Sequence, residues 1–182
     1  VHIDTARGQI AARIGAEVDS ICFTSGATES DNMALIGTMN ANQHRGRHLI
    51  TSTLEHKAVL DTAYALKDQG FEITFVDHDE HGVISTQQLA TAIRNDTVLV
   101  SIMHVNNETG VLQDLAALGE LCQERGVLFH VDAAQSVGKV PLNVADFSVD
   151  LVSLTAHKAY GPMGIGALYI RKGMKIAPMI YG

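Results

Sequence analysis

The apolar stretches VLVSIMH at residues 98–104 and VLFHV at residues 127–131, with the amphipathic segment 114–125 between them, decide the fold of this chain. Both stretches are unbroken and rich in β-branched residues, which is typical of strands buried on both faces. Segment 114–125 has helical periodicity and stops at Gly126, a frequent end signal for helices. Strand, helix and strand in this order predict two parallel strands with a helix packed on their sheet.

The same alternation continues on both sides of this unit. We expect further helices over residues 4–14, 28–40, 57–69 and from 85 onward, and further strands over 20–24, 48–52, 71–76, 151–154 and 165–170. This pattern predicts the α/β fold class, with a mostly parallel sheet covered by helices on both faces. No repeat, linker or internal boundary interrupts the pattern, so we expect residues 1–182 to belong to one domain.

Composition excludes several classes of protein. Of 182 residues, 46% are hydrophobic and 18% are charged, which is typical of a globular chain rather than a disordered one. The net charge of −7 argues against a nucleic-acid partner, and no apolar run approaches the ~20 residues needed to span a bilayer. Cys22 and Cys122 have apolar flanks, which indicates buried thiols in a reducing compartment, and we expect a cytoplasmic protein.

The two ends indicate a piece of a longer protein. The first residue is Val1 rather than methionine, and the last residues, Pro178 to Gly182, form no polar tail.

Polar side chains follow five of the predicted strands. The clusters are Ser25-Gly26-Ala27-Thr28, Glu55-His56, Asn106-Asn107-Glu108, Asp132 with Gln135, and Thr155-Ala156-His157-Lys158. In sheets of parallel strands, ligands bind beyond the carboxyl ends of the strands. Five polar clusters at one edge therefore predict a ligand site there.

Two of these clusters suggest an anion and a reactive amine. At Thr28 a strand turns into a helix, whose first N–H groups and dipole attract anions, although Thr28 can equally be a plain helix cap. Lys158 directly follows a buried strand beside His157, and partial desolvation there would make its amine a Schiff-base candidate. The alternative for Lys158 is a solvated surface lysine.

The other clusters leave alternatives open as well. A buried Asp132 needs a cation, which the pyridinium nitrogen of pyridoxal phosphate would supply, or it caps the following turn. His56 can stack on a planar cofactor or move protons as a catalytic residue, or it only caps the helix that begins at Lys57. Asn107 and Gln135 can bond a cofactor or a substrate, or merely hold a loop. The glycine-rich segment 161–166 precedes a strand instead of joining a strand to a helix, so it does not predict a dinucleotide site.

Five blocks in order carry a resemblance to a known family. They are residues 23–32 (FTSGATESDN), 55–57 (EHK), 104–110 (HVNNETG), 130–136 (HVDAAQS) and 157–162 (HKAYGP). The chain resembles the cysteine desulfurases of the class V aminotransferase group, and the blocks cover nearly all of it. The resemblance implies a fold-type I transferase, of which residues 1–182 are part of the large domain that binds pyridoxal phosphate.

The resemblance also implies roles for single residues. Lys158 would hold pyridoxal phosphate covalently and act as the catalytic base, and His56 would stack on the ring. Asp132 would pair with the ring nitrogen, and Gln135 would bond the phenolate oxygen with Asn107 close by. The phosphate would be held by Ala27, Thr28, Thr155 and His157. Thr155 and Ala156 replace the serine and glycine expected in the family, which bears on the phosphate geometry alone.

The implied reaction removes sulfur from L-cysteine, giving L-alanine and an enzyme persulfide for iron–sulfur cluster assembly and other sulfur transfer. The implied partners are a second copy of the chain in a homodimer and a sulfur-acceptor or scaffold protein. We expect the nucleophilic cysteine, the arginine for the substrate carboxylate and a small C-terminal domain to lie beyond residue 182. Cys22 and Cys122 match no such nucleophile, so we expect this chain alone to be inactive.

Three alternatives remain at this stage. One is a selenocysteine lyase or another enzyme of the same group. A second is a metal-dependent hydrolase, in which strand-end residues hold the metal: His56, His104, His130, Asp132 and His157. The third is a non-enzymatic scaffold whose polar strand ends only cap helices. The resemblance implies no metal site.

Overall fold

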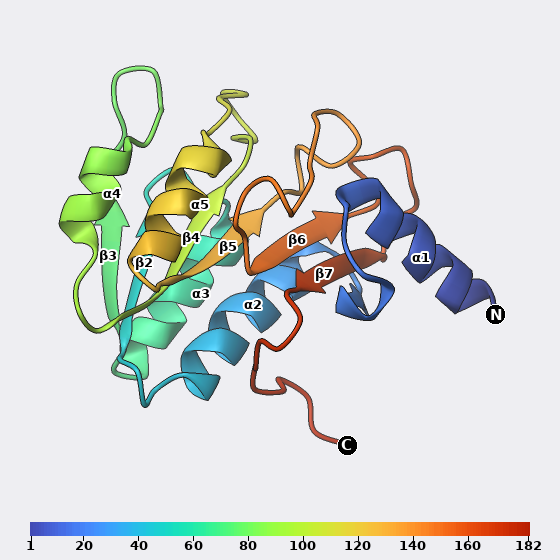
Figure 1. The fold of residues 1–182 in the computed structure, drawn as a ribbon, viewed down its shortest axis with the longest axis horizontal. Coiled ribbons are helices and arrows are strands. Elements are labelled where there is room, and N and C mark those ends of the chain that lie inside the picture. Colours follow the sequence, from blue (N-terminus) through green and yellow to red (C-terminus); the bar gives the residue numbers. More distant parts are fainter.

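A computed structural model describes all 182 residues, arranged around one seven-stranded sheet (Figure 1). The strands are β1 (Ile21–Thr24), β2 (His48–Ser52), β3 (Glu72–Val76), β4 (Thr97–Met103), β5 (Leu128–Asp132), β6 (Leu151–Thr155) and β7 (Gly166–Ile170). Each begins and ends within one residue of its predicted bounds. The apolar runs of the sequence therefore mark all the strands of the sheet.

The strand order in space is β1-β7-β6-β5-β4-β2-β3. The central strands β6, β5, β4, β2 and β3 pair in parallel. β7 is antiparallel to both of its neighbours, β6 and β1, so β1 points the same way as the central strands. This confirms the predicted mostly parallel sheet, and it brings six carboxyl ends and the beginning of β7 to one edge.

Helices cover both faces of the sheet, as predicted. They are α1 (His2–Ile14), α2 (Ala27–Ala41), α3 (Lys57–Asp68), α4 (Thr86–Ala92) and α5 (Leu115–Glu124), with a short 3-10 helix η1 (Val18–Ser20) after α1. Figure 1 shows α4 and α5 on the near face of the sheet and α2 and α3 behind it. None of these helices is both long and apolar enough to cross a bilayer.

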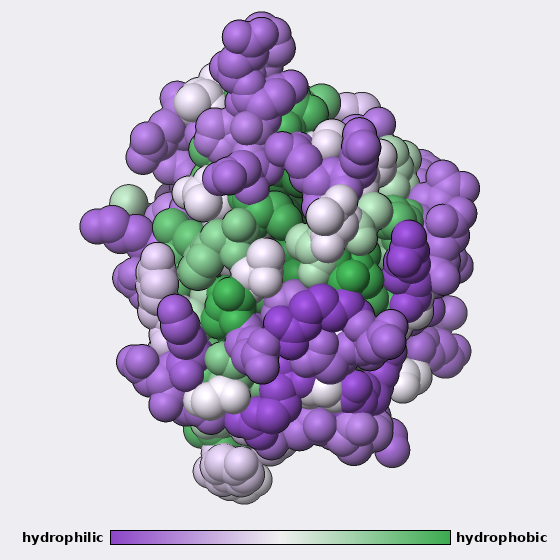
Figure 2. All heavy atoms as spheres, turned by 90° about the vertical axis from the view of Figure 1, so that its left-hand side faces the viewer, coloured by the Kyte–Doolittle hydropathy of each residue, from purple (hydrophilic) through white to green (hydrophobic).

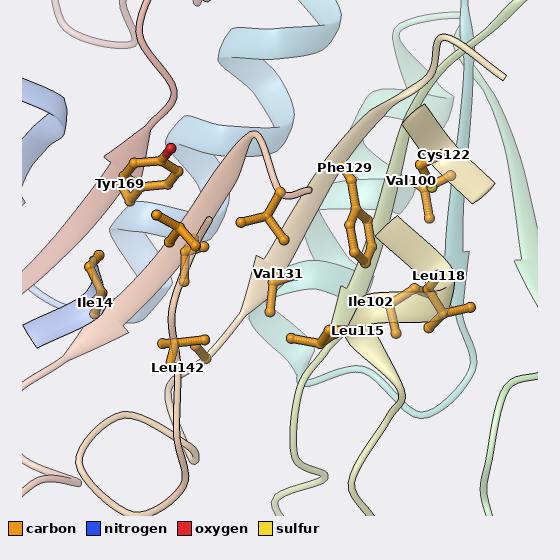
Figure 3. Close-up of a cluster of buried hydrophobic side chains, with 14 of the residues drawn as sticks. Ile14, Val100, Ile102, Leu115, Leu118, Cys122, Phe129, Val131, Leu142 and Tyr169 are labelled. Carbon is orange, nitrogen blue, oxygen red and sulfur yellow. The ribbon is translucent and has the colours of Figure 1, made fainter. Parts of the chain in front are cut away.

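Each face of the sheet has its own apolar core. Val100, Ile102 and Phe129 point from β4 and β5 toward Leu118 of α5, and all four are fully buried (Figure 3). Leu99, between Val100 and Val98 on β4, belongs to the other core, against α2 and α3. Burying one such side chain contributes about 1.5–3 kcal/mol, so unbroken apolar strands are stabilised from both sides.

The sheet has an exposed edge at β3. This strand is only half-buried along most of its length, and the ring of Phe75 packs on Tyr64 of α3 at 5.3 Å between centroids. Glu72 forms an ion pair with Arg94 at 2.6 Å. Figure 2 views the molecule from this side and shows a hydrophobic area rimmed by hydrophilic residues. The charges at the rim are of the kind that discourages edge-to-edge pairing.

At the opposite end, β7 can join β1 and β6 only because Gly166 has no side chain. Gly166 pairs with Thr24 of β1 on one side and Thr155 of β6 on the other. A Cβ atom at Gly166 would lie 2.5 Å from Cα of Gly26 and 2.6 Å from the carbonyl oxygen of Leu154. The backbone at Gly166 therefore lies closer to those of Gly26 and Leu154 than a residue with a side chain would allow.

We expect Gly166→Ala to destabilise the protein by at least about 2 kcal/mol, because backbone atoms cannot rotate away from the new methyl group. Urea unfolding measures this change. The matched control is Gly8→Ala in α1, where an added Cβ has nothing within 4 Å. That helical alanine should be neutral or stabilising by up to about 1 kcal/mol. Equal unfolding midpoints for the two variants would contradict the proposed close approach.

Candidate active site

A pocket of about 400 Å³ lies at the edge where the parallel strands end. Its walls come from the beginning of α2, the residue before α3, the ends of β5 and β6, and the loop before β7. Seven of the predicted site residues line it: Ala27, Thr28, His56, Asp132, Thr155, His157 and Lys158. The predicted convergence of strand-end residues is therefore present in the fold.

The N-terminus of α2 opens into this pocket. The helix begins at Ala27, its cap residue is Gly26, and no side chain caps it. Thr28 is thus inside the first turn, with an exposed side chain, and it is not the cap. The Glu29 carboxylate accepts the Ser25 N–H at 2.6 Å, and hydrogen bonding with Ser25 lowers the pKa of Glu29. No side chain caps the N–H groups of Gly26 to Thr28, so these groups can donate hydrogen bonds to an anion.

His56 has one of the roles considered for it in the sequence, that of a helix cap, and its stacking on a cofactor remains a prediction. Its Nδ1 accepts the N–H of Ala58 at 3.1 Å, so it caps α3. The ring also lines the pocket. The cap bond fixes the ring at the pocket wall and leaves Nε2 and the ring face free.

Asp132 ends β5 with only 5% of its surface exposed. Its Oδ1 accepts the N–H of Ala134 at 2.8 Å. Burial raises the pKa of Asp132, and the Ala134 bond and the charges of Lys158 and His56 lower it. Because one oxygen is held by the turn, the carboxylate has a set orientation in the pocket wall.

The segment after β6 supplies the amine. The Thr155 hydroxyl and His157 Nδ1 are 2.9 Å apart, and the half-buried Lys158 follows. Tyr160, two residues on, has a φ of 62°, in the left-handed region that non-glycine residues rarely adopt. This tight turn directs Lys158 into the pocket that Asp132 also lines.

Two predicted site residues lie outside the pocket wall. Asn107 is exposed on a turn that the side chain of its neighbour Asn106 organises, with Oδ1 of Asn106 accepting the N–H groups of Glu108 and Thr109 at 2.9 and 2.8 Å. Gln135 is half-buried and is contacted by Lys139 at 3.5 Å. Their roles as cofactor ligands remain predictions.

The pocket also contains residues that the sequence pattern did not single out. One of them is Asp31, an acidic residue close to the beginning of a predicted helix. It is the fifth residue of α2 and is 1% exposed, because it lies on the same helix face as the buried Ala34 and Leu35. Met163 and Gly164 line the pocket as well, because the antiparallel β7 begins at this edge.

Glu55 is a further buried carboxyl beside the site. Its Oε1 accepts the Ser52 hydroxyl at 2.8 Å and the Met103 N–H at 2.9 Å, while Oε2 has no partner. Burial raises the pKa of Glu55 from 4.5 to about 8. The group therefore keeps its proton at neutral pH.

The histidines that a metal-dependent hydrolase would need are not gathered. His130 is fully buried between Ser101 and Ser153, and His104 packs edge-on against Phe147 at 5.9 Å. No group of three His, Cys, Asp or Glu side chains is placed to hold a metal ion. The geometry of these residues offers that alternative no ligand set.

Glu55→Gln should reduce the pH dependence of stability. Between pH 4.5 and 8 the folded chain keeps a proton on Glu55 that the unfolded chain loses. The free energy of unfolding of the wild type therefore falls as pH rises, by up to roughly 1.4 kcal/mol per pH unit from this group. Urea titrations measure this effect. From pH 4.5 to 8, we expect the free energy of unfolding of Glu55→Gln to rise steadily relative to that of the wild type.

The exposed Glu120 supplies the control for that measurement. Glu120→Gln should shift stability by a small amount that is the same at every pH. A constant difference between Glu55→Gln and wild type would mean that Glu55 is ionised in the folded protein.

The chain is similar to known proteins that are named as cysteine desulfurases. Among curated relatives, the "Cysteine desulfurase IscS" of Proteus mirabilis is 58% identical over 174 residues and that of Vibrio cholerae (strain M66-2) is 59% identical over 174 residues. Each match covers 96% of this chain but 43% of the relative, so the chain spans less than half the length of these relatives.

Solved structures show the same fold. A "NifS-like protein" is 40% identical with a TM-score of 0.96, covering 100% of this chain and 50% of that one. "SspA in complex with cysteine" is 44% identical with a TM-score of 0.95, covering 99% of this chain and 52% of that one. A family model described as aminotransferase class-V matches residues 1–182. The chain therefore belongs to the aminotransferase class-V family, whose structural neighbours share its α/β fold.

Proposed function

We propose that the protein is a cysteine desulfurase that uses pyridoxal phosphate to remove sulfur from L-cysteine, leaving L-alanine. The observation that carries this proposal is that Lys158 and Asp132 line one pocket together with the uncapped N-terminus of α2. An amine, a buried carboxylate and an anion site are the three things this cofactor needs. The names of the relatives support the choice of substrate.

The chemistry of the pocket fits the cofactor. The phosphate fits the first turn of α2 at Ala27 and Thr28, with Thr155 and His157 on the other side. The ring nitrogen fits Asp132, whose buried carboxylate forms no ion pair within the chain, and the ring plane fits His56. Asn107 and Gln135 are proposed as ligands on the family resemblance alone.

Pyridoxal phosphate, when bound, supplies an electron sink for the negative charge left on the substrate Cα atom. Lys158 would hold the cofactor covalently through Nζ and would then take the Cα proton. Asp132 would keep a proton on the ring nitrogen, because a buried carboxylate favours an adjacent cation. His56 would exclude water from one face of the ring.

The sulfur-accepting thiolate is not in this pocket. Cys122 is fully buried in α5, where burial raises the pKa of its thiol to about 12. Cys22 lies in β1 with its Sγ 3.7 Å from the carbonyl of Phe23, and neither cysteine lines the pocket. We therefore propose that residues 1–182 are part of the large cofactor domain and that the nucleophile, and the arginine for the substrate carboxylate, come from other parts of the protein.

Partners and location follow from the same proposal. A homodimer, a sulfur-acceptor or scaffold protein and a cytoplasmic location would fit a desulfurase that supplies iron–sulfur cluster assembly. The family resemblance alone supports these assignments.

Lys158→Ala should abolish covalent attachment of the cofactor. Borohydride reduction after incubation with pyridoxal phosphate should add one cofactor mass to the peptide containing Lys158 in the wild type and none in the variant. Lys67→Ala, at an exposed position of α3, should keep the adduct. An adduct mapped to any other lysine would contradict the assignment.

The 182-residue chain alone should not turn over L-cysteine. Removing a nucleophile that takes part in the chemical step costs many orders of magnitude in rate, since catalytic groups act as a unit. Sulfide and alanine are assayed together after incubation with pyridoxal phosphate, L-cysteine and a reductant. Repeated turnover would show that Cys22 or Cys122 is the nucleophile. If the whole protein released selenium from selenocysteine but no sulfur from L-cysteine, this result would favour a selenocysteine lyase.

A further inference from the structure

A second carboxyl group, that of Asp31, lines the pocket beside Asp132 and takes no part in the chemistry described above. Asp31 is 1% exposed, and neither of its oxygens has a hydrogen-bond partner. An unpartnered carboxyl group at this depth is rare, because burying an ionised one without a partner costs several kcal/mol. The presence of such a group in the pocket lining therefore suggests that it serves the site.

The residue of β5 that Asp31 contacts, His130, is uncharged. His130 lies between the hydroxyls of Ser101 and Ser153, with Nδ1 2.8 Å from the first and Nε2 2.9 Å from the second. Nε2 of His130 is also 3.6 Å from Oδ1 of Asp31. Burial lowers the pKa of His130 to about 3, so its ring is neutral and supplies no positive charge. The contact between His130 and Asp31 is therefore not an ion pair.

The charged groups around Asp31 favour its protonated form. Burial raises its pKa most and the negative charge of Asp132 raises it further, while the nearby Ser153 hydroxyl and the charge of Lys158 lower it. Asp132 differs, because it accepts the Ala134 N–H and has both Lys158 and His56 nearby. When two carboxyl groups share a site, the better-supported one ionises first. Here that group is Asp132.

We propose that Asp31 is a positioning residue of the pocket: it holds a proton at neutral pH and so leaves Asp132 as the one buried carboxylate that faces the ligand, the other carboxylate of the lining being the less buried Glu29. The inference rests on the proposed cofactor for the identity of that ligand. A second buried negative charge beside Asp132 would repel a ligand that carries a phosphate dianion. The protonated Asp31 thereby limits the negative charge of the pocket.

The proton on Asp31 is tested first without cofactor, by a ¹³C NMR titration of the aspartate carboxyl carbons in the protein. Asp31→Asn identifies the signal. We expect Asp31 to be protonated at pH 7 and Asp132→Asn to lower its titration midpoint, because the neighbouring charge is gone. Asp31→Asn should leave the midpoint of Asp132 almost unchanged. An Asp31 ionised at pH 7 would overturn the proposal.

The consequence for binding is tested with pyridoxal phosphate, from neutral pH to above the Asp31 midpoint found by NMR. Asparagine has the shape of the neutral acid, so Asp31→Asn should bind like the wild type at pH 7. Above the midpoint the wild type should bind roughly tenfold more weakly than the variant, because only the wild type gains a charge. Asp68→Asn, which removes a carboxylate from the exposed end of α3, should follow the wild type throughout.

Two outcomes of the binding experiment would overturn the proposal. One is a ratio of affinities between wild type and Asp31→Asn that is the same at every pH. The other is a loss of affinity in Asp31→Asn at pH 7, which would make Asp31 an ionised ligand. If neither the wild type nor any variant binds pyridoxal phosphate although NMR shows a protonated Asp31, the proposed cofactor is wrong. The proposed role of the Asp31 proton in binding is then wrong as well.

Discussion

The antiparallel pairing of β7 between β1 and β6 is the constraint on which the pocket depends. β1 is the first strand in the sequence and has no parallel neighbour in the sheet. Only β7 holds it against β6, and the closeness of Gly166 to Gly26 makes that pairing possible. Without it, the turn that begins α2 would not lie beside the turn that contains Lys158. The two halves of the pocket come from segments about 130 residues apart, and β7 joins the two strands that precede them, β1 and β6.

Local hydrogen bonds hold the reactive groups in place before any ligand binds. His56 caps α3 through Nδ1, and Asp132 accepts the N–H of Ala134 through Oδ1. In each case one polar atom is used by the backbone while the rest of the side chain is presented to the pocket. The alternatives of cap and ligand, which compete when the sequence is read alone, are thus compatible in the fold. Fixing a side chain in this way reduces the entropy lost when a ligand binds.

The interior below the pocket is unusually polar for a sheet core. Ser101, His130 and Ser153 form a hydrogen-bonded row across β4, β5 and β6, on the side of the sheet covered by α2. Asp31 and Glu55 extend this polar region to the carboxyl ends of the strands. Such groups contribute less to stability than apolar packing would, and burial raises the pKa of both carboxyl groups. Their presence is explained by the site rather than by the stability of the sheet.

The sequence by itself determined the elements and most of the site. Unbroken apolar runs such as 98–104 predicted strands buried on both faces, because a parallel sheet between two helix layers leaves no strand face to water. The rule that ligands bind at strand carboxyl ends identified Lys158, Asp132 and His56 as neighbours, although more than 20 residues separate each of them from the next along the chain.

Only the tertiary structure decided what depends on the order and direction of strands and on the face of a helix. Asn107 and Gln135 follow the right strands yet lie outside the pocket wall, since a turn can point a side chain away from the edge. Met163 entered the pocket because β7 runs against its neighbours, and no local pattern reveals that direction. Asp31 has no pattern in the sequence that marks it as a site residue, and only the packing of α2 on the sheet buries it in the pocket lining. Local patterns report which elements form, whereas burial and proximity arise only when elements distant in the sequence pack together.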